Sequence, residues 1–119
     1  MARTILVAVK DLLFGSKIQE AGKRTGTALQ WSPRFDRLRD VAETKAPDVI
    51  IADLGEPGML DELAAVREKR PGTRILGFAG HVQEDLMAQA QQLGVTEVFS
   101  KGQFNTQLDR ILARERGEG

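Results

Sequence analysis

The chain has 119 residues, which suits one domain, and it contains no cysteine. The absence of cysteine excludes a disulfide scaffold, a thiol nucleophile and a zinc–thiolate site. Lysine plus arginine equals aspartate plus glutamate at 17 each, so the formal net charge is zero. This balance argues against nucleic acid as a partner, because such binding depends on a basic surface.

Membrane insertion and secretion are not expected either. No apolar run approaches the roughly 20 residues that a membrane helix needs. The N-terminal segment MARTILVAVK is too short for a signal peptide and lacks a small-residue cleavage site. We therefore expect a cytoplasmic protein with no membrane partner, formed by one domain over 1–119 with a frayed tail at 116–119.

Short apolar runs alternate with longer amphipathic segments along the chain. The apolar runs are typical of strands covered on both faces, and the amphipathic segments are typical of helices. The predicted strands cover 4–9, 27–31, 48–53, 74–80 and 95–100. The predicted helices cover 13–25, a segment starting at Ser32 and Pro33, 59–70, 83–93, and a segment marked by Phe104, Leu108, Ile111 and Leu112.

Several local signals set these boundaries. Ser32 followed by Pro33 is typical of an N-cap and a first helical residue. Gly94 is a typical residue just after a helix end. The basic run at 67–74 is interpreted as a helix end, where cations are favourable. Gly77 is expected to permit close packing of its strand.

Five strands alternating with five helices predict a parallel sheet with helices on both faces. Functional groups in such sheets lie at the carboxyl ends of the strands, near the switch in strand order. Asp53 stands at the end of the most apolar strand and Lys101 at the end of the last strand. A carboxylate and a lysine two strands apart form a specific pairing.

The segments DVIIADLGEPG and GVTEVFSKG, taken together and in this order, resemble the receiver domain of bacterial two-component systems, the CheY-like fold. The resemblance covers almost the whole chain. It implies a three-layer α/β/α sandwich with a sheet in the order 2-1-3-4-5. It also implies that Asp53 corresponds to the phosphoacceptor, Pro57 to the proline that follows it, and Lys101 to the lysine of the family.

The resemblance also shows where metal binding is weakened. The family carries an acidic pair after the first strand, which binds Mg²⁺ together with the phosphoacceptor. Val9 and Lys10 occupy these positions, and Asp11 follows one residue too late. The remaining donors make a poor Mg²⁺ site, so we expect no metal and no other cofactor, with Asp11 and Asp53 as the fallback ligands.

This sequence also differs from the family at two positions that respond to phosphorylation in receiver domains. The hydroxyl residue that grips the phosphoryl group in the family corresponds to Ala79, and the switch aromatic corresponds to Val98. We expect Lys10 and Lys101 to flank Asp53 instead and to neutralise it without metal. The sequence thus predicts an atypical, pseudo-receiver signalling module and not an enzyme.

Without a covalent switch, function is expected to reside in a surface. The resemblance places it on the fourth helix, fifth strand and fifth helix, where Met87 and four glutamines suggest a face for a protein partner such as a histidine kinase or an output protein. An ordinary solvated helix face explains the same pattern. Gln83, Gln89, Gln91 and Gln92 are those glutamines.

Two alternatives remain open. One is a working response regulator phosphorylated on Asp53 by a histidine kinase, with Asp11 and Glu56 completing a Mg²⁺ site. The other is a flavodoxin-like enzyme or cofactor carrier, although GFAG at 77–80 lacks the length of a phosphate loop. The single histidine, His81, is interpreted as a solvated loop residue.

Overall fold

The computed structural model describes residues 3–80 and 83–117 and contains one five-stranded parallel sheet in the order β2-β1-β3-β4-β5. The strands are β1 (Ile5–Ala8), β2 (Leu29–Trp31), β3 (Val49–Asp53), β4 (Arg74–Ala79) and β5 (Glu97–Ser100). The helices are α1 (Leu12–Thr25), α2 (Leu38–Lys45), α3 (Met59–Lys69), α4 (Glu84–Leu93), α5 (Lys101–Thr106) and α6 (Leu108–Glu115).

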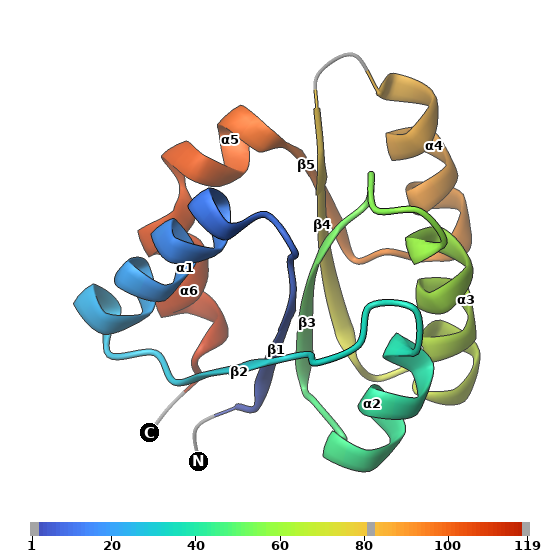
Figure 1. Cartoon of the computed structure of the whole chain (residues 1–119), viewed down its shortest axis with the longest axis horizontal. Helices are drawn as coiled ribbons and strands as arrows, with labels where there is room; N and C mark the ends of the chain where they lie inside the picture. The colour runs from blue at the N-terminus through green and yellow to red at the C-terminus, as the bar shows by residue number, and fades with distance from the viewer. Residues whose placement is uncertain (1–2, 81–82, 118–119) are drawn as a thin grey trace.

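The helices cover the two faces of the sheet. Figure 1 shows α1, α5 and α6 on one side and α2, α3 and α4 on the other. This arrangement confirms the predicted α/β/α sandwich and its strand order. The described part of the chain has six helices where five were predicted, because Gln107 separates α5 from α6 within the last helical segment.

Two apolar clusters explain why the strands are apolar on both faces. Along β3, Val49 and Ile51 pack toward α1 and α6, whereas Ile50 and Ala52 pack toward α2 and α3. This is the period-two alternation of a strand, with helices burying each face. Burial of both faces carries β3 through the centre of the molecule and delivers Asp53 to its carboxyl edge.

Gly77 permits close packing of β4, as predicted. A Cβ built on Gly77 would lie 2.6 Å from Cδ2 of Leu54, a side chain that is itself buried. No such contact is possible in a packed interior without displacement of one group. The absence of a side chain at Gly77 therefore lets the β3–α3 connection lie directly on β4.

The predicted start of the second helix is wrong. The Ser32 hydroxyl donates to the Arg34 carbonyl, and the Ser32 N–H donates to Val7 O, so Ser32 extends the pairing of β2 with β1. Helix α2 begins only at Leu38. Its first turn is capped from α3, since Glu62 Oε1 accepts the Arg39 N–H at 3.0 Å. A cap from another element leaves no signal in the local sequence.

The basic run at 67–74 ends a helix, as predicted. Helix α3 ends at Lys69, and the Arg67 guanidinium donates to the carbonyls of Pro71, Thr73 and Gly94 at 2.8–3.0 Å. These bonds satisfy backbone acceptors after the helix end and join it to the α4–β5 turn. Among residues 3–80 and 83–117, no helix is both long enough and apolar enough to cross a membrane.

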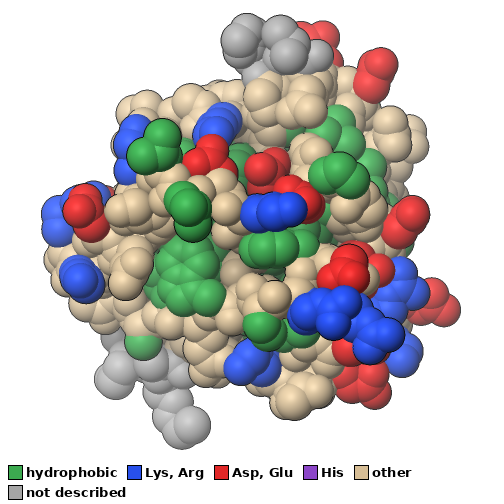
Figure 2. All heavy atoms as spheres, in the orientation of Figure 1, with side chains coloured by type: hydrophobic (Ala, Val, Ile, Leu, Met, Phe, Trp, Pro, Cys, Tyr) green, Lys and Arg blue, Asp and Glu red, His purple; other side chains and the backbone are tan. Residues whose placement is uncertain are grey.

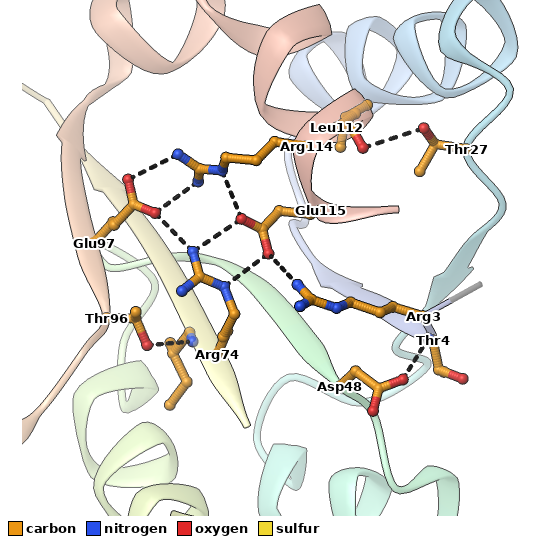
Figure 3. Close-up of polar contacts among 11 residues, drawn as sticks. Arg3, Thr4, Thr27, Asp48, Arg74, Thr96, Glu97, Leu112, Arg114 and Glu115 are labelled. Atoms are coloured by element: carbon orange, nitrogen blue, oxygen red, sulfur yellow. Dashed lines mark hydrogen bonds and ion pairs between the residues drawn. The ribbon is translucent and has the colours of Figure 1, made fainter. Parts of the chain in front are cut away.

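A buried carboxylate ties α6 to the amino-terminal ends of the strands (Figure 3). The Glu115 side chain is 1% exposed and forms ion pairs with Arg3, Arg74 and Arg114, at 3.3, 2.8 and 2.8 Å. Arg74 and Arg114 also pair with Glu97 on β5. Burial opposes ionisation, but the hydrogen bonds from Arg74 and Arg114 outweigh it and lower the pKa of Glu115.

The described end of the chain continues from this cluster. The Arg3 N–H donates to Arg116 O at 3.0 Å, and the Arg116 guanidinium donates to the Thr25 carbonyl. Arg116, the first residue of the tail predicted to fray, is thus bonded to two other segments. Residues 118–119 of that tail lie outside the described residues.

We expect Glu115→Gln to lower the free energy of unfolding at pH 7 by about 2 kcal/mol, because three arginines lose the buried charged acceptor that they share. A lowered folded-state pKa gives stability that is present above the ordinary glutamate value of 4.5 and is lost as pH falls through the folded pKa. The difference between wild type and variant, measured by urea unfolding, should therefore shrink as the pH falls below 4.5.

Glu68→Gln is the matched control, because Glu68 is exposed and is also on a helix. A change within about 0.5 kcal/mol is expected for it. Equal stability of Glu115→Gln and wild type at pH 7 would show that the cluster does not hold α6.

Candidate functional site

Asp53 is the last residue of β3 and lies half-buried at the carboxyl edge of the sheet. Its Oδ1 accepts the N–H of Gly55 at 2.9 Å, which closes the first turn of the β3–α3 connection. In the sheet, Asp53 pairs with Phe78 of β4. Asp53 therefore stands at the carboxyl end of a central strand, and its neighbours there differ from those predicted.

Asp11 is the carboxylate with the most partners at this edge. It is the N-cap of α1, where its Oδ1 accepts the N–H groups of Leu13 and Phe14 at 2.9 and 3.1 Å. Its Oδ2 lies 3.3 Å from Nζ of Lys101. The Phe14 hydrogen bond, followed by the Lys101 hydrogen bond, lowers the pKa of Asp11. Both oxygens of Asp11 are therefore engaged within the protein.

Lys101 is held by Asp11 and not by Asp53, which corrects the predicted pairing. Its Nζ also lies 5.0 Å from the centre of the Phe14 ring, a cation–π distance. Phe14 is fixed in turn by Phe78 and Phe104, with ring centres 4.9 and 6.0 Å away. The N-cap and first turn of α1 thus supply both groups that bind the Lys101 ammonium, the carboxylate of Asp11 and the ring of Phe14.

Lys10 does not pair with Asp53 either. Its nearest carboxylate is Glu56, with Nζ 3.9 Å from Oε1. Strand β1 ends at Ala8, so Lys10 lies in the connection that leads to α1. Its side chain is 70% exposed and reaches Glu56 in the β3–α3 connection. The predicted neutralisation of Asp53 by Lys10 is therefore not seen.

The two altered switch positions lie on the α4 side of the sheet. Ala79 is buried there, and Val98 is half-buried against the same cluster. The aromatic residue of β5 is Phe99, whose ring packs against Phe104 on the other face with centres 5.5 Å apart. No aromatic side chain of β5 therefore points toward α4. The hydroxyl of Ser100, at the end of β5, caps α5 by accepting the Gln103 N–H.

Gln83 is a site residue that the sequence does not reveal. The sequence places it only among surface glutamines, yet its Oε1 accepts the N–H of Gly80 at 2.9 Å. This contact lies at the end of β4, next to Asp53 across Gly55. The nearby His81 lies outside the described residues.

The donors present do not fit a Mg²⁺ site. Mg²⁺ requires near-octahedral oxygen ligands, of which carboxylates are the strongest contribution from a protein. Within residues 3–80 and 83–117, no group of three His, Cys, Asp or Glu side chains is placed to hold a metal ion. Asp11, one of the two fallback ligands, is committed to α1 and Lys101. Glu56, which would complete the site of a working response regulator, faces Lys10.

Comparison with known proteins supports the fold. No protein-family model and no curated protein sequence matches the chain. Solved structures do match it. The receiver domain of NtrX from Brucella abortus has a TM-score of 0.79 at 16% identity, covering 97% of this chain and 99% of that one.

Two further structures agree. The REC domain of AraT, a response regulator from Geobacillus stearothermophilus, has a TM-score of 0.79 at 19% identity, covering 98% of this chain and 94% of its own. A response regulator protein from Burkholderia multivorans has a TM-score of 0.75 at 21% identity, covering 100% and 98%. The chain therefore has the fold of response-regulator receiver domains.

We expect Asp11→Ala to lower Tm at pH 7 by more than Asp11→Asn, because asparagine keeps a capping oxygen while alanine removes both the cap and the ion pair. The lowered pKa of Asp11 means that its charge stabilises the fold above the ordinary value of 3.8 and ceases to do so as pH falls through the folded pKa. The Asn variant should therefore approach wild type in acid. Thermal unfolding followed by circular dichroism tests this order, and identical Tm values for all three proteins would refute the role of Asp11.

Proposed function

We propose that this protein is a receiver-like signalling module of the two-component, phosphorelay type, atypical in having weak or no Mg²⁺-dependent phosphorylation and acting by binding a protein partner. The fold supports the general class of module. The atypical behaviour is inferred from the site. The observation that carries it is the commitment of Asp11 and Lys101 to each other, which leaves Asp53 with a backbone partner alone among its hydrogen bonds in the described structure.

Phosphoryl transfer to Asp53 would need positive charge on the oxygens of the transferring group. A divalent ion usually supplies it, and the donor set for such an ion is incomplete here. Ala79 supplies no hydroxyl to that group, and Lys101 is 3.3 Å from another carboxylate. Each of these features lowers the stabilisation available to the transition state, so we assign Asp53 the position of a phosphoacceptor without its full chemistry.

Partner binding is the remaining role, and two surfaces lie near the site. The first is the face of α4, β5 and α5 that the sequence indicates, where Gln89 and Gln91 are exposed and Met87 and Val98 are half-buried. Strand β5 is also an edge of the sheet, so one row of its backbone groups has no neighbouring strand. We propose this face as the docking surface for a kinase or output protein.

The second surface is the start of α1. Leu12 and Leu13 are 88% and 81% exposed, and they are the large hydrophobic side chains most open to solvent in the described part of the chain. On the face drawn in Figure 2, charges of both signs are interspersed, with no broad area of one sign. A protein partner suits such a surface better than nucleic acid.

We expect no saturable, Mg²⁺-dependent binding of beryllofluoride to the wild-type protein, because the metal ligands are incomplete. Fluorine NMR of the bound fluorides gives the measurement, and Asp53→Asn provides the background signal. Labelling with acetyl phosphate, followed by mass spectrometry of the intact protein, gives an independent result. Tight binding that requires both Mg²⁺ and Asp53 would establish instead a working response regulator phosphorylated on Asp53.

We expect a photo-crosslinking amino acid at Gln91, an exposed residue of α4 in the proposed docking face, to capture a partner protein in living cells. The same probe is placed at Leu12 for the competing surface and at Glu68 on α3 as a control, since all three positions are exposed. Mass spectrometry identifies the captured protein. Crosslinks at Leu12 without crosslinks at Gln91 would move the docking surface to α1.

A further inference from the structure

The side chain of Gln83 is folded back against the loop that follows β4. The Gln83 N–H donates to Gly80 O at 2.9 Å, and Gln83 Oε1 accepts the Gly80 N–H at 2.9 Å. These two bonds join the same pair of residues in opposite directions. The Gln83 side chain is half-buried, although it precedes α4 at the surface of the molecule.

Two glycines leave the space that the Gln83 amide fills. A Cβ built on Gly80 would lie 3.3 Å from Gln83 Oε1. A Cβ built on Gly55 would lie 3.2 Å from Gln83 Nε2 and 3.3 Å from Asp53 Oδ1. The amide of Gln83 and the carboxylate of Asp53 therefore both lie within 3.3 Å of a single point above Gly55.

Backbone N–H groups at the ends of β3 and β4 are thereby occupied by the chain's own side chains. The Gly55 N–H is taken by Asp53, and the Gly80 N–H is taken by Gln83. An oxyanion entering between the two loops would need such donors. It would have to displace Gln83 first.

We propose that Gln83 is an intramolecular plug of the site: its amide occupies the space beside Asp53 and excludes groups of the size of phosphate. The proposal deepens the proposed function, on which it rests for the role of Asp53, because it adds a steric cause to the missing metal donors. The plug is a side chain and not a covalent modification, so a partner that draws Gln83 away exposes Asp53 reversibly.

The test measures access to Asp53 without metal. The protein is treated with a water-soluble carbodiimide and glycinamide, which converts accessible carboxylates into amides, and peptide mass spectrometry gives the initial rate at each position. The exposed Asp61 in the same sample is the internal reference. We expect Gln83→Ala to raise the relative rate at Asp53 by about five- to tenfold, the factor expected when opening no longer breaks a hydrogen bond.

Gln89→Ala is the matched control, because Gln89 is an exposed glutamine of α4 whose truncation should leave the rate at Asp53 unchanged. Gly80→Ala is the second variant, since its added methyl group crowds Oε1 while Gln83 remains; a smaller increase is expected. If Gln83→Ala proves unstable, Gly80→Ala decides the question alone.

An unchanged or lower rate at Asp53 in the folded variants would overturn the plug. This outcome is distinct from failure of the proposed function, which would appear as tight Mg²⁺-dependent beryllofluoride binding to the wild-type protein. A role of Gln83 in loop stability alone would lower Tm without changing the relative rate at Asp53, and would also refute the proposal.

Discussion

The carboxylate of Asp11 determines which group Lys101 contacts at the carboxyl edge of the sheet. One oxygen caps the first turn of α1 and the other binds the ammonium of Lys101. The cap is intrinsic to the helix, because the first N–H groups of any helix need acceptors. Because capping fixes the position of Asp11, its carboxylate attracts the nearest cation. That cation is Lys101, which also lies over the Phe14 ring. The way in which α1 begins therefore explains why Lys101 forms its ion pair with Asp11 and not with Asp53.

The fold could be predicted because burial imposes a pattern of apolar and amphipathic segments that is visible in a single sequence. Strands with both faces covered are apolar throughout, and the five runs alternate with amphipathic segments, so a parallel sheet with helices on both faces was predictable. The position of Asp53 follows from the same rule. The strand order was predicted from the resemblance to receiver domains and not from this pattern.

The start of α2 could not be predicted in this way, since its cap comes from Glu62, which is distant in the sequence. Ser32 and Pro33 have the local signature of a helix start, but Ser32 pairs with β1.

The partners of the charged side chains could not be predicted for a different reason. Several acids and lysines reach the same edge, and exposed ion pairs differ by a few tenths of a kcal/mol. Lys10 is 70% exposed and pairs with Glu56. It lies past the end of β1, where the alternation of a strand no longer fixes the direction of a side chain. Gln83 had no signal at all, since its contact depends on two glycines in different loops.

The two edges of the sheet differ in how their charged side chains are paired. At the amino edge, Glu115 and three arginines fasten α6 to the strands. At the carboxyl edge, no ion pair joins Asp53 to a lysine within the described residues, and the loop donors are satisfied by Asp53 and Gln83. Across the described part of the chain, no buried side-chain nitrogen or oxygen lacks a partner. Under the proposed function, a partner acting at this edge would have to outcompete the protein's own contacts. Those contacts are single hydrogen bonds, individually weak enough for a docked protein to replace.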